Sequence, residues 1–303
     1  MKITVNELTR LAGFFPEATE ISLFRNVSGT PDGSEDGSLE EKGVLTGGEL
    51  SPQAREIFSV VAGAARCSRM VMRDGLMVVE KYTYRLGDSL VVAENEQGEL
   101  KFSAPSNLNG VLKGISQFTG LSDLKTSALE VLLSLEELLC YLGCCDLTRR
   151  DTLRAAAGDK ELDGRFTLEE LEEELKNPLE TGLLRLTMAN YGWSLPEGAE
   201  VKNLLEGLLV RSMLEYGEGK YSLQDEYYLF AARFLIPQLV AVLEAFDTQP
   251  DGSTLMGQAL VISAGLRDSA CLIPGDEGVE FSTLSAGQII TLCESFMNCP
   301  ELG

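Results

Sequence analysis

The chain has 303 residues, 44% hydrophobic and 24% charged, a composition typical of a globular protein with a substantial core. Its 47 acidic and 25 basic residues give a net charge of −22, and such a surface repels the phosphates of nucleic acids. It contains no histidine, which excludes Ser–His–Asp and Cys–His nucleophilic catalysis and histidine-based zinc sites.

The N-terminal region predicts a helix, a strand and a loop. Thr4 is the expected N-cap of a helix over residues 4–11, because Glu7 follows three residues later as in a capping box. Residues 20–27 are expected to form a strand. Residues 28–38 are acidic and rich in turn formers, and this composition indicates a mobile loop.

A long helix and a three-stranded meander follow. Ser51 is the expected N-cap of the helix, with Pro52 in its first turn, and the helix is expected to end near residue 69. Residues 76–118 then read LMVVEKYTYRL, SLVVAE and ELKFSA, separated by the turns GD and NEQG and followed by PSNLNGVLKGISQF. This pattern predicts three strands and a closing helix.

The same order recurs near the C-terminus. From residue 259 the chain reads ALVISAGL, SACLIP and VEFST, with the turns RD and GDEG, and closes with LSAGQIITLCESFM. The segment before each meander also corresponds, since residues 42–64 and 211–235 both pass from a Gly-rich turn through a serine into a long apolar helix. A tandem duplication explains this recurrence.

The middle of the chain is expected to be helical. Residues 123–143 are almost continuously apolar and predict one helix, which residues 148–158 continue. Thr167, with Glu170 three residues later, marks the start of an acidic helix. Residues 201–214 predict a further helix.

These elements together predict an α+β fold made of two related halves. Residues 1–122 form the first half-repeat, residues 123–166 are connecting helices, and residues 167–303 form the second half-repeat. The halves are expected to share one antiparallel sheet of about six strands, flanked by helical bundles, in one continuous globular unit.

The seven cysteines indicate free thiols in a reducing compartment. Their number is odd, they are scattered, and most have apolar neighbours, unlike a disulfide framework. The N-terminal segment lacks the features of a signal peptide, and no apolar run approaches the ~18 residues that cross a membrane. A cytoplasmic protein is therefore expected, without a membrane association.

No motif predicts catalysis, a metal or a cofactor. Cys140 and Cys144 lack the loop spacing and second ligand pair of a zinc site, and the acidic stretch from Asp32 has glycine where a calcium loop needs its last glutamate. The helix at 201–214 lies in a winged-helix-like pattern but is not basic, so a structural role is preferred to DNA binding. An enzyme that uses carboxylates or Cys67 remains a minor alternative.

The meanders are the candidate partner-binding surface, because a sheet covered by helices on only one face leaves a row of side chains on the other face available. Alternation along the first strand divides its side chains into two rows, and the turns NEQG and QPDGST are the loops expected to project. That both rows pack under the chain's own helices is the interpretation preferred for the strand itself. The candidate residues are Met77, Val79, Tyr82, Tyr84, Asn95, Glu96, Gln97, Gln249 and Asp251.

The repeated order of elements, with the opening ITVNEL and turns such as RLGDSLVVAENEQGEL, resembles the EspG-type chaperones of type VII (ESX) secretion. The resemblance runs from Lys2 to Met297. It implies a quasi-twofold core with a central antiparallel sheet and two helical bundles, a cytosolic location and no enzymatic activity. It also implies that helical PE–PPE substrates are held by an exposed hydrophobic tip, here placed at the first meander's loop and the C-terminal bundle. The cysteine content and the acidic segment 169–174 depart from the family.

The leading functional hypothesis is a non-catalytic, cytosolic, secretion-chaperone-like protein that shields an apolar surface of a helical partner. The acidic shell either keeps the complex soluble or attracts a basic partner. The alternative is a transcription-associated or other protein–protein adaptor that uses the winged-helix-like units for protein contacts.

Overall fold

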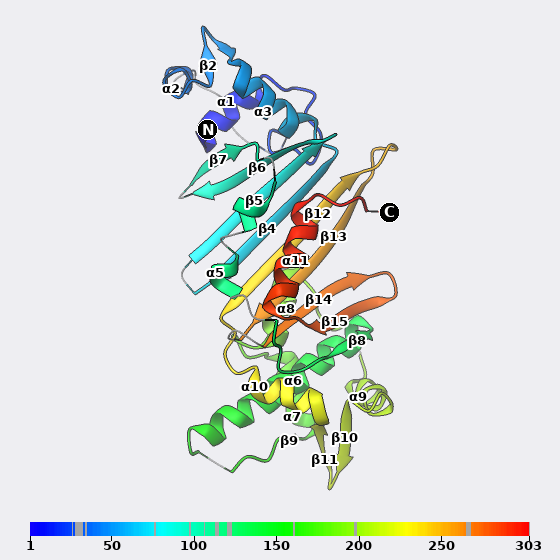
Figure 1. The fold of residues 1–303 in the computed structure, drawn as a ribbon. Helices are drawn as coiled ribbons and strands as arrows, with labels where there is room; N and C mark the ends of the chain where they lie inside the picture. Colours follow the sequence, from blue (N-terminus) through cyan, green and yellow to red (C-terminus); the bar gives the residue numbers. More distant parts are fainter. Residues whose placement is uncertain are drawn as a thin grey trace. The chain divides into compact units, whose positions relative to one another are not determined.

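The computed structural model of the chain is shown in Figure 1. It describes residues 1–25, 27, 33, 35–75, 77–96, 98–105, 107–112, 115–119, 123–159, 161–196, 199–264 and 268–302. The chain divides into two compact units. Unit 1 consists of Met1–Ile115, Val242–Gln258 and Ile290–Gly303, and unit 2 of Ser116–Ala241 and Ala259–Ile289. Each unit is thus built from several chain segments, and the linear division at residues 122 and 166 stays a prediction.

Unit 1 begins with a small helical region and continues into strands. Its elements are β1 (Lys2–Thr4), α1 (Val5–Ala12), α2 (Glu35–Glu41), β2 (Leu45–Thr46), β3 (Glu49–Leu50), α3 (Pro52–Gly63), β4 (Arg66–Asp74), β5 (Met77–Leu86), β6 (Ser89–Glu96), β7 (Glu99–Ser103) and α4 (Asn109–Leu112).

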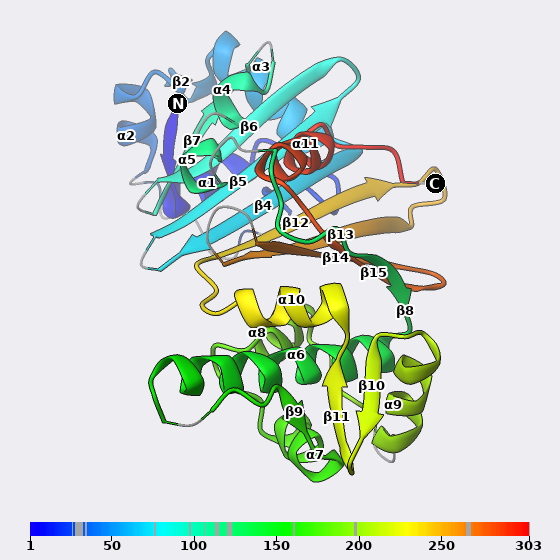
Figure 2. The same cartoon turned by 60° about the horizontal axis from the view of Figure 1, so that its bottom comes forward.

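Unit 2 is richer in helices. Its elements are α5 (Ser116–Thr119), β8 (Glu130–Leu133), α6 (Leu135–Ala156), β9 (Arg165–Phe166), α7 (Leu168–Lys176), α8 (Leu183–Tyr191), α9 (Val201–Val210), β10 (Leu214–Gly217), β11 (Lys220–Leu223), α10 (Asp225–Arg233), β14 (Ser269–Gly275) and β15 (Gly278–Thr283). Three elements contribute residues to both units: β12 (Leu239–Thr248), β13 (Thr254–Ser263) and α11 (Ala286–Met297). Figure 2 shows α10 lying along α6.

The main sheet is antiparallel and has ten strands in the order β1-β7-β6-β5-β4-β12-β13-β14-β15-β8. The strands expected from the two meanders are all present, as β5, β6, β7, β13, β14 and β15. The element order also recurs, since a small hairpin, a helix and four strands follow one another in both halves. The α+β class and the shared antiparallel sheet are therefore confirmed, whereas the origin by duplication stays a prediction.

Four strands of the main sheet were not expected: β1, β4, β8 and β12. The long helix from Ser51 ends at Gly63 rather than near residue 69, and β4 occupies the remainder. Residues of β4 such as Cys67 and Met70 are buried, and strands covered on both faces lose the alternation that reveals a strand.

The expected helix at 123–143 is also wrong in its first half. Ser134 is the true N-cap of α6, with Glu137 completing a capping box, and the apolar run before it forms β8. Apolar runs of this length do not distinguish a strand from a helix by periodicity. The helix at 201–214 likewise ends earlier, at Val210, and Leu214 begins β10.

Three further expectations need correction. Residues 20–25 form turns instead of a strand, because Ser22 and Arg25 donate their amides to carbonyls three residues earlier. Within the expected loop at 28–38, α2 begins at Glu35, and residues 28–32 and 34 lie outside the described residues. The closing helix of the first meander is reduced to the short helices α4 and α5.

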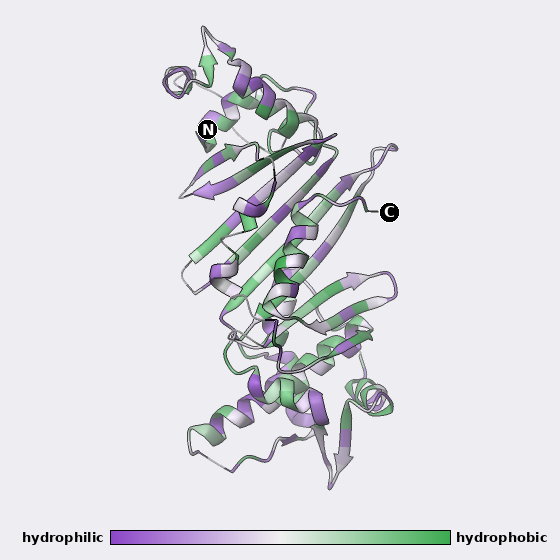
Figure 3. Cartoon of the chain, in the orientation of Figure 1, coloured by the Kyte–Doolittle hydropathy of each residue, from purple (hydrophilic) through white to green (hydrophobic). Residues whose placement is uncertain are grey.

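Each unit has its own aromatic core. In unit 1, Phe58 packs edge-on against Phe24 and Phe102, with ring centroids 5.7 and 5.2 Å away. In unit 2, Phe281 packs edge-on against Tyr141 and Phe230, at 5.2 and 5.5 Å. Figure 3 shows hydrophobic stretches along β4, β5, β12 and β14. Through the aromatic contacts, Phe102 of β7 packs on α3, and Phe281 of β15 packs on α6 and α10.

Candidate partner-binding site

The start of β5 exposes apolar side chains. Met77 pairs with Asp74 of β4 across a tight turn, and Met77 and Val78 are 56% and 62% exposed. Val79 is half-buried. Successive residues of a strand point to opposite faces, so both faces of this hairpin end present an apolar group. We call Met77, Val78 and Val79 the hairpin-end surface.

In the middle of β5 the side chains are more covered. Tyr84 is 1% exposed and belongs to the core of unit 1, so the expectation that it contacts a partner is corrected. Tyr82 is half-buried, and its hydroxyl donates to Oε1 of Glu80 at 2.7 Å. Burial, together with this hydrogen bond, raises the pKa of Tyr82 to about 12. Tyr82 is therefore a fixed hydrogen-bond donor.

An ion-pair network surrounds Tyr82. The Arg69 guanidinium bonds Glu80 of β5 at 2.8 Å and Glu244 of β12 at 3.1 Å, and Gln258 of β13 donates to Glu244 at 3.3 Å. Burial alone would raise the pKa of Glu80, but hydrogen bonds from Tyr82 and Arg69 outweigh it and the pKa is lowered. The network holds Arg69 between two ionised carboxylates and ties neighbouring strands together.

A pocket of about 420 Å³ opens beside this network. Cys67, Tyr82 and Phe246 are among its lining residues. Cys67 is 4% exposed, and burial raises the pKa of its thiol far above the ordinary value. A thiol that stays protonated is a poor nucleophile, which argues against catalysis by Cys67.

The turn between β6 and β7 lies at the same end of the sheet as the hairpin-end surface, because Asn95 is opposite Glu80. Asn95 Oδ1 accepts the amide of Gly98 at 3.2 Å, and Glu96 forms ion pairs with Lys2 at 2.7 Å and Lys101 at 3.0 Å. The side chains of Asn95 and Glu96 thus stabilise the β6–β7 turn and its contact with β1. Gln97 lies outside the described residues.

The structure does not bring Gln249 and Asp251 to this end. Thr248 donates its amide to Ala65 at 2.8 Å, next to the start of β4, whereas Met77 lies opposite the last residue of β4. Gln249 donates to Leu302 O at 3.3 Å, and Asp251 accepts from the amide and hydroxyl of Ser253 at 2.9 and 2.6 Å. These two residues shape their own turn.

Sequence reasoning missed several exposed apolar residues. Val78, Leu255 and Met256 flank hairpin turns, and the last two are 41% and 55% exposed. In unit 2, Val210 ends α9 and is 87% exposed. All of these residues lie beside a turn or at a helix end. Their position could have predicted their exposure, because the ends of strands and helices project beyond the elements that pack on them.

The described residues contain no group of three or more His, Cys, Asp or Glu side chains arranged to hold a metal ion. All seven cysteines are buried and free, as expected from their neighbours. Within the same described ranges, no helix has the length and apolarity needed to span a membrane.

Comparison with known proteins bears on the fold. No protein-family model matches the chain, and no curated protein matches it. A solved structure does match: the Mycobacterium tuberculosis type VII secretion chaperone EspG5, determined in complex with the PE25–PPE41 dimer. The TM-score is 0.56 at 9% sequence identity, over 100% of this chain and 97% of that one.

The chain has the fold of EspG5. The likeness spans both units and confirms the distant resemblance that the order of the sequence elements indicates. At 9% identity it shows the fold alone.

Proposed function

We propose that the chain is a non-catalytic cytosolic binding protein of secretion-chaperone type, which shields an apolar surface of a helical protein partner. The observation that carries the proposal is the full-length likeness to a chaperone that was solved with the PE25–PPE41 dimer. The partner of this chain is proposed to be a helical protein, with a secretion substrate as the first candidate.

The hairpin-end surface is the proposed contact region. When a partner covers the exposed methionine and valine side chains at the end of this hairpin, side-chain freedom is lost but little backbone freedom, because the strand backbone is already fixed. Met77 and Val78 are each more than half exposed, and Arg69 and Glu80 anchor the two strands behind them. Apolar groups on a rigid support are suited to capping an apolar partner surface.

A pull-down of the tagged protein from its native cytosol, followed by mass spectrometry, tests the proposal. We expect a helical protein in near-equal amount. Recovery of polymerase or regulator subunits would instead favour the adaptor hypothesis, and an empty pull-down under mild conditions would contradict the chaperone proposal.

Surface variants then test the contact region by titration calorimetry with the recovered partner. The double variant Met77→Ser/Val78→Ser is expected to weaken binding by about tenfold or more, because two exposed apolar groups are lost. Val5→Ser is the matched control, since Val5 is 58% exposed on α1 of the same unit. Equal affinities of the two variants would place the contact elsewhere.

A further inference from the structure

A second pocket in unit 1 is chemically different from the one beside Tyr82. It has a volume of about 510 Å³ and lies between α3, the β5–β6 turn, the segment around Leu108 and the end of α11. Aliphatic side chains supply its apolar lining, among them Ile57 and Val60 of α3 and Leu90 of β6. We call this the α3 pocket.

Carboxylates surround the aliphatic lining. Glu56 comes from α3, Asp88 from the β5–β6 turn and Glu294 from α11, and all three are exposed. Among the described residues, none of the three is in an ion pair. Carboxylates from three separate elements therefore lie at the α3 pocket without a paired cation among the described residues.

The pocket has little positive charge of its own. Arg85 is the one cation among its described lining residues, and its Nε donates to the backbone carbonyl of Asn298 at 2.9 Å. The three carboxylates and this arginine leave a formal charge of −2. The pocket beside Tyr82 differs here, because Arg69 already bonds Glu80 and Glu244.

We infer that the α3 pocket binds a basic peptide segment of a partner protein, in which one aliphatic side chain is flanked by lysine or arginine. The aliphatic group fits against Ile57, Val60 and Leu90, and the flanking cations reach Glu56, Asp88 and Glu294. A compact organic cation fits less well, because such ligands are bound by aromatic faces and the described lining has none.

Polar groups at the opening suit a peptide backbone. Ser89, Asn107, Asn109 and Asn298 line the same pocket, and hydroxyl and amide side chains pair with peptide N–H and C=O groups. The pocket thus combines an apolar anchor site, charged contacts and hydrogen-bonding groups. The inference is independent of the hairpin-end surface and holds whether or not that surface binds a helical partner.

Fluorescence anisotropy with labelled synthetic peptides tests the inference on the full chain. The probe is a short peptide with one central leucine flanked by lysines, and two control peptides replace the lysines by glutamate or the leucine by serine. We expect the lysine–leucine peptide to bind, the glutamate peptide not to bind, and the serine peptide to bind about tenfold more weakly.

Protein variants separate a specific site from general attraction to an acidic protein. Glu56→Gln/Asp88→Asn/Glu294→Gln is expected to weaken binding by about tenfold or more. Glu17→Gln/Glu40→Gln/Glu49→Gln removes the same charge from exposed positions outside the pocket and is expected to weaken it by less than about threefold.

Val60→Thr tests the apolar lining without changing charge, and it too is expected to weaken binding. Circular dichroism checks that each variant is folded. Equal loss in the two triple variants, or equal binding of the leucine and serine peptides by the unmodified chain, would overturn the inference.

Discussion

Asp146 carries a charge inside unit 2, where its side chain is 0% exposed. Its carboxylate accepts from Arg149 at 2.7 Å and from the amides of Leu183 and Leu184 at 2.9 and 3.0 Å. Helix α8 begins after Gly182, which has no side chain to cap it, so Asp146 of α6 supplies the cap. One residue thereby fixes the start of α8 on α6.

The pKa of Asp146 predicts a component of the pH dependence of stability. Burial raises this pKa to about 6, against 3.8 for the free side chain, although Arg149 and the two amides lower it. Because the folded pKa is the higher one, the folded state binds the proton more tightly between these values. The contribution of Asp146 to the free energy of unfolding is therefore fully present below pH 3.8 and is lost as the pH rises through about 6.

Urea unfolding at a series of pH values measures this component against Asp146→Asn, which cannot ionise. We expect the difference in unfolding free energy, wild type minus variant, to fall by roughly 3 kcal/mol from about pH 4 to pH 7. Glu174 and Cys145 also lie near the carboxylate and are unchanged in the variant. A difference that rose with pH would show that Arg149 and the amides dominate the pKa.

At the scale of elements, three helix starts were predicted at the correct residue, whereas two strands of the main sheet were taken for parts of helices. Thr4, Ser51 and Thr167 are N-caps as expected, because the capping hydrogen bond is made within three residues and needs no tertiary information. The strand β8 was missed because its pairing partner β15 is distant in sequence and its apolar run resembles a helix. The strand β4 was missed because it is buried on both faces, which removes the alternation that reveals a strand.

Two capping boxes allow a test of how tertiary contacts add to a local motif. Glu7 is 3% exposed, caps α1, and also accepts from Ser38 at 2.7 Å and Lys42 at 2.8 Å, which fastens α2. Glu7→Ala is expected to cost about 2 kcal/mol and to increase hydrogen exchange in α2.

Glu170→Ala is the matched control. Glu170 closes the capping box of α7 at an exposed position, and its loss is expected to cost about 0.5–1 kcal/mol without an effect on α2. Chemical denaturation and hydrogen exchange measure both effects. Equal costs would mean that the contacts of Glu7 with α2 add nothing to its capping role.

The turn before β15 depends on glycine for two reasons. Gly278 has φ +146°, and a Cβ on it would stand against the backbone carbonyl oxygen of Leu133 in β8. Gly278→Ala is therefore expected to destabilise unit 2 by about 3 kcal/mol and to loosen β8.

Gly252 provides the matched comparison. It has φ +87°, and no atom lies within 4 Å of the place that a Cβ would take, so Gly252→Ala carries backbone strain alone, about 1 kcal/mol. Denaturation midpoints together with exchange rates at residues 130–133 distinguish the two variants. Similar midpoints would contradict a steric role for the Leu133 carbonyl.

For the whole molecule, the candidate site was predictable only in part. The sequence alternation identified β5 and placed Met77 on it, but it did not show that the middle of the strand is covered and its ends are exposed. Burial of Tyr84 and separation of Gln249 from Met77 depend on the order of strands in the sheet and on helices from distant parts of the chain. Periodicity within one segment contains neither piece of information.

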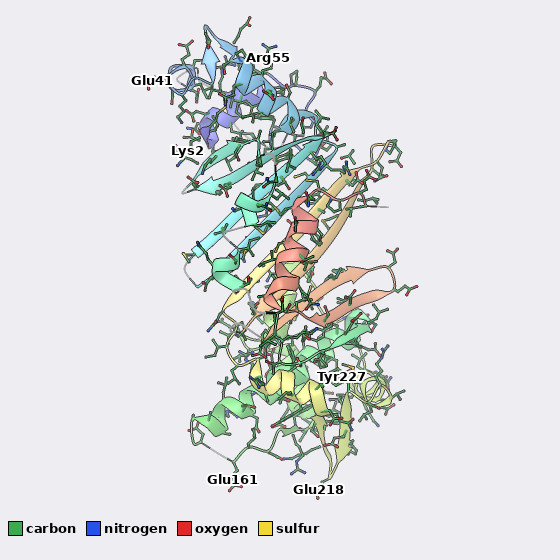
Figure 4. All side chains as sticks on the ribbon, in the orientation of Figure 1. Lys2, Glu41, Arg55, Glu161, Glu218 and Tyr227 are labelled. Carbon is green, nitrogen blue, oxygen red and sulfur yellow. The ribbon has the colours of Figure 1, made fainter. Side chains whose placement is uncertain are left out.

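The acidic balance acts on the molecule as a whole. The net charge of −22 is the excess of 47 acidic over 25 basic residues. Many of the basic side chains are already bonded to acids, as Arg10 is to Asp36 and Lys220 to Asp163, so few cations are left to offset this excess. Figure 4 shows surface glutamates such as Glu41 and Glu161 projecting from the ribbon. Surplus charge of one sign repels itself and destabilises the compact state.

Added NaCl is therefore expected to stabilise the protein, because the screening length falls from about 30 Å at 0.01 M to about 8 Å at 0.15 M. We expect a gain on the order of 1 kcal/mol, measured as a higher thermal midpoint. Sulfate is unsuitable, since it also strengthens apolar burial.

The variant Glu17→Gln/Glu40→Gln/Glu49→Gln changes the net charge by three, from −22 to −19. Its thermal midpoint is expected to rise less with NaCl than that of the unmodified chain. A midpoint that falls with NaCl would show instead that the ion pairs, which salt also screens, outweigh the repulsion.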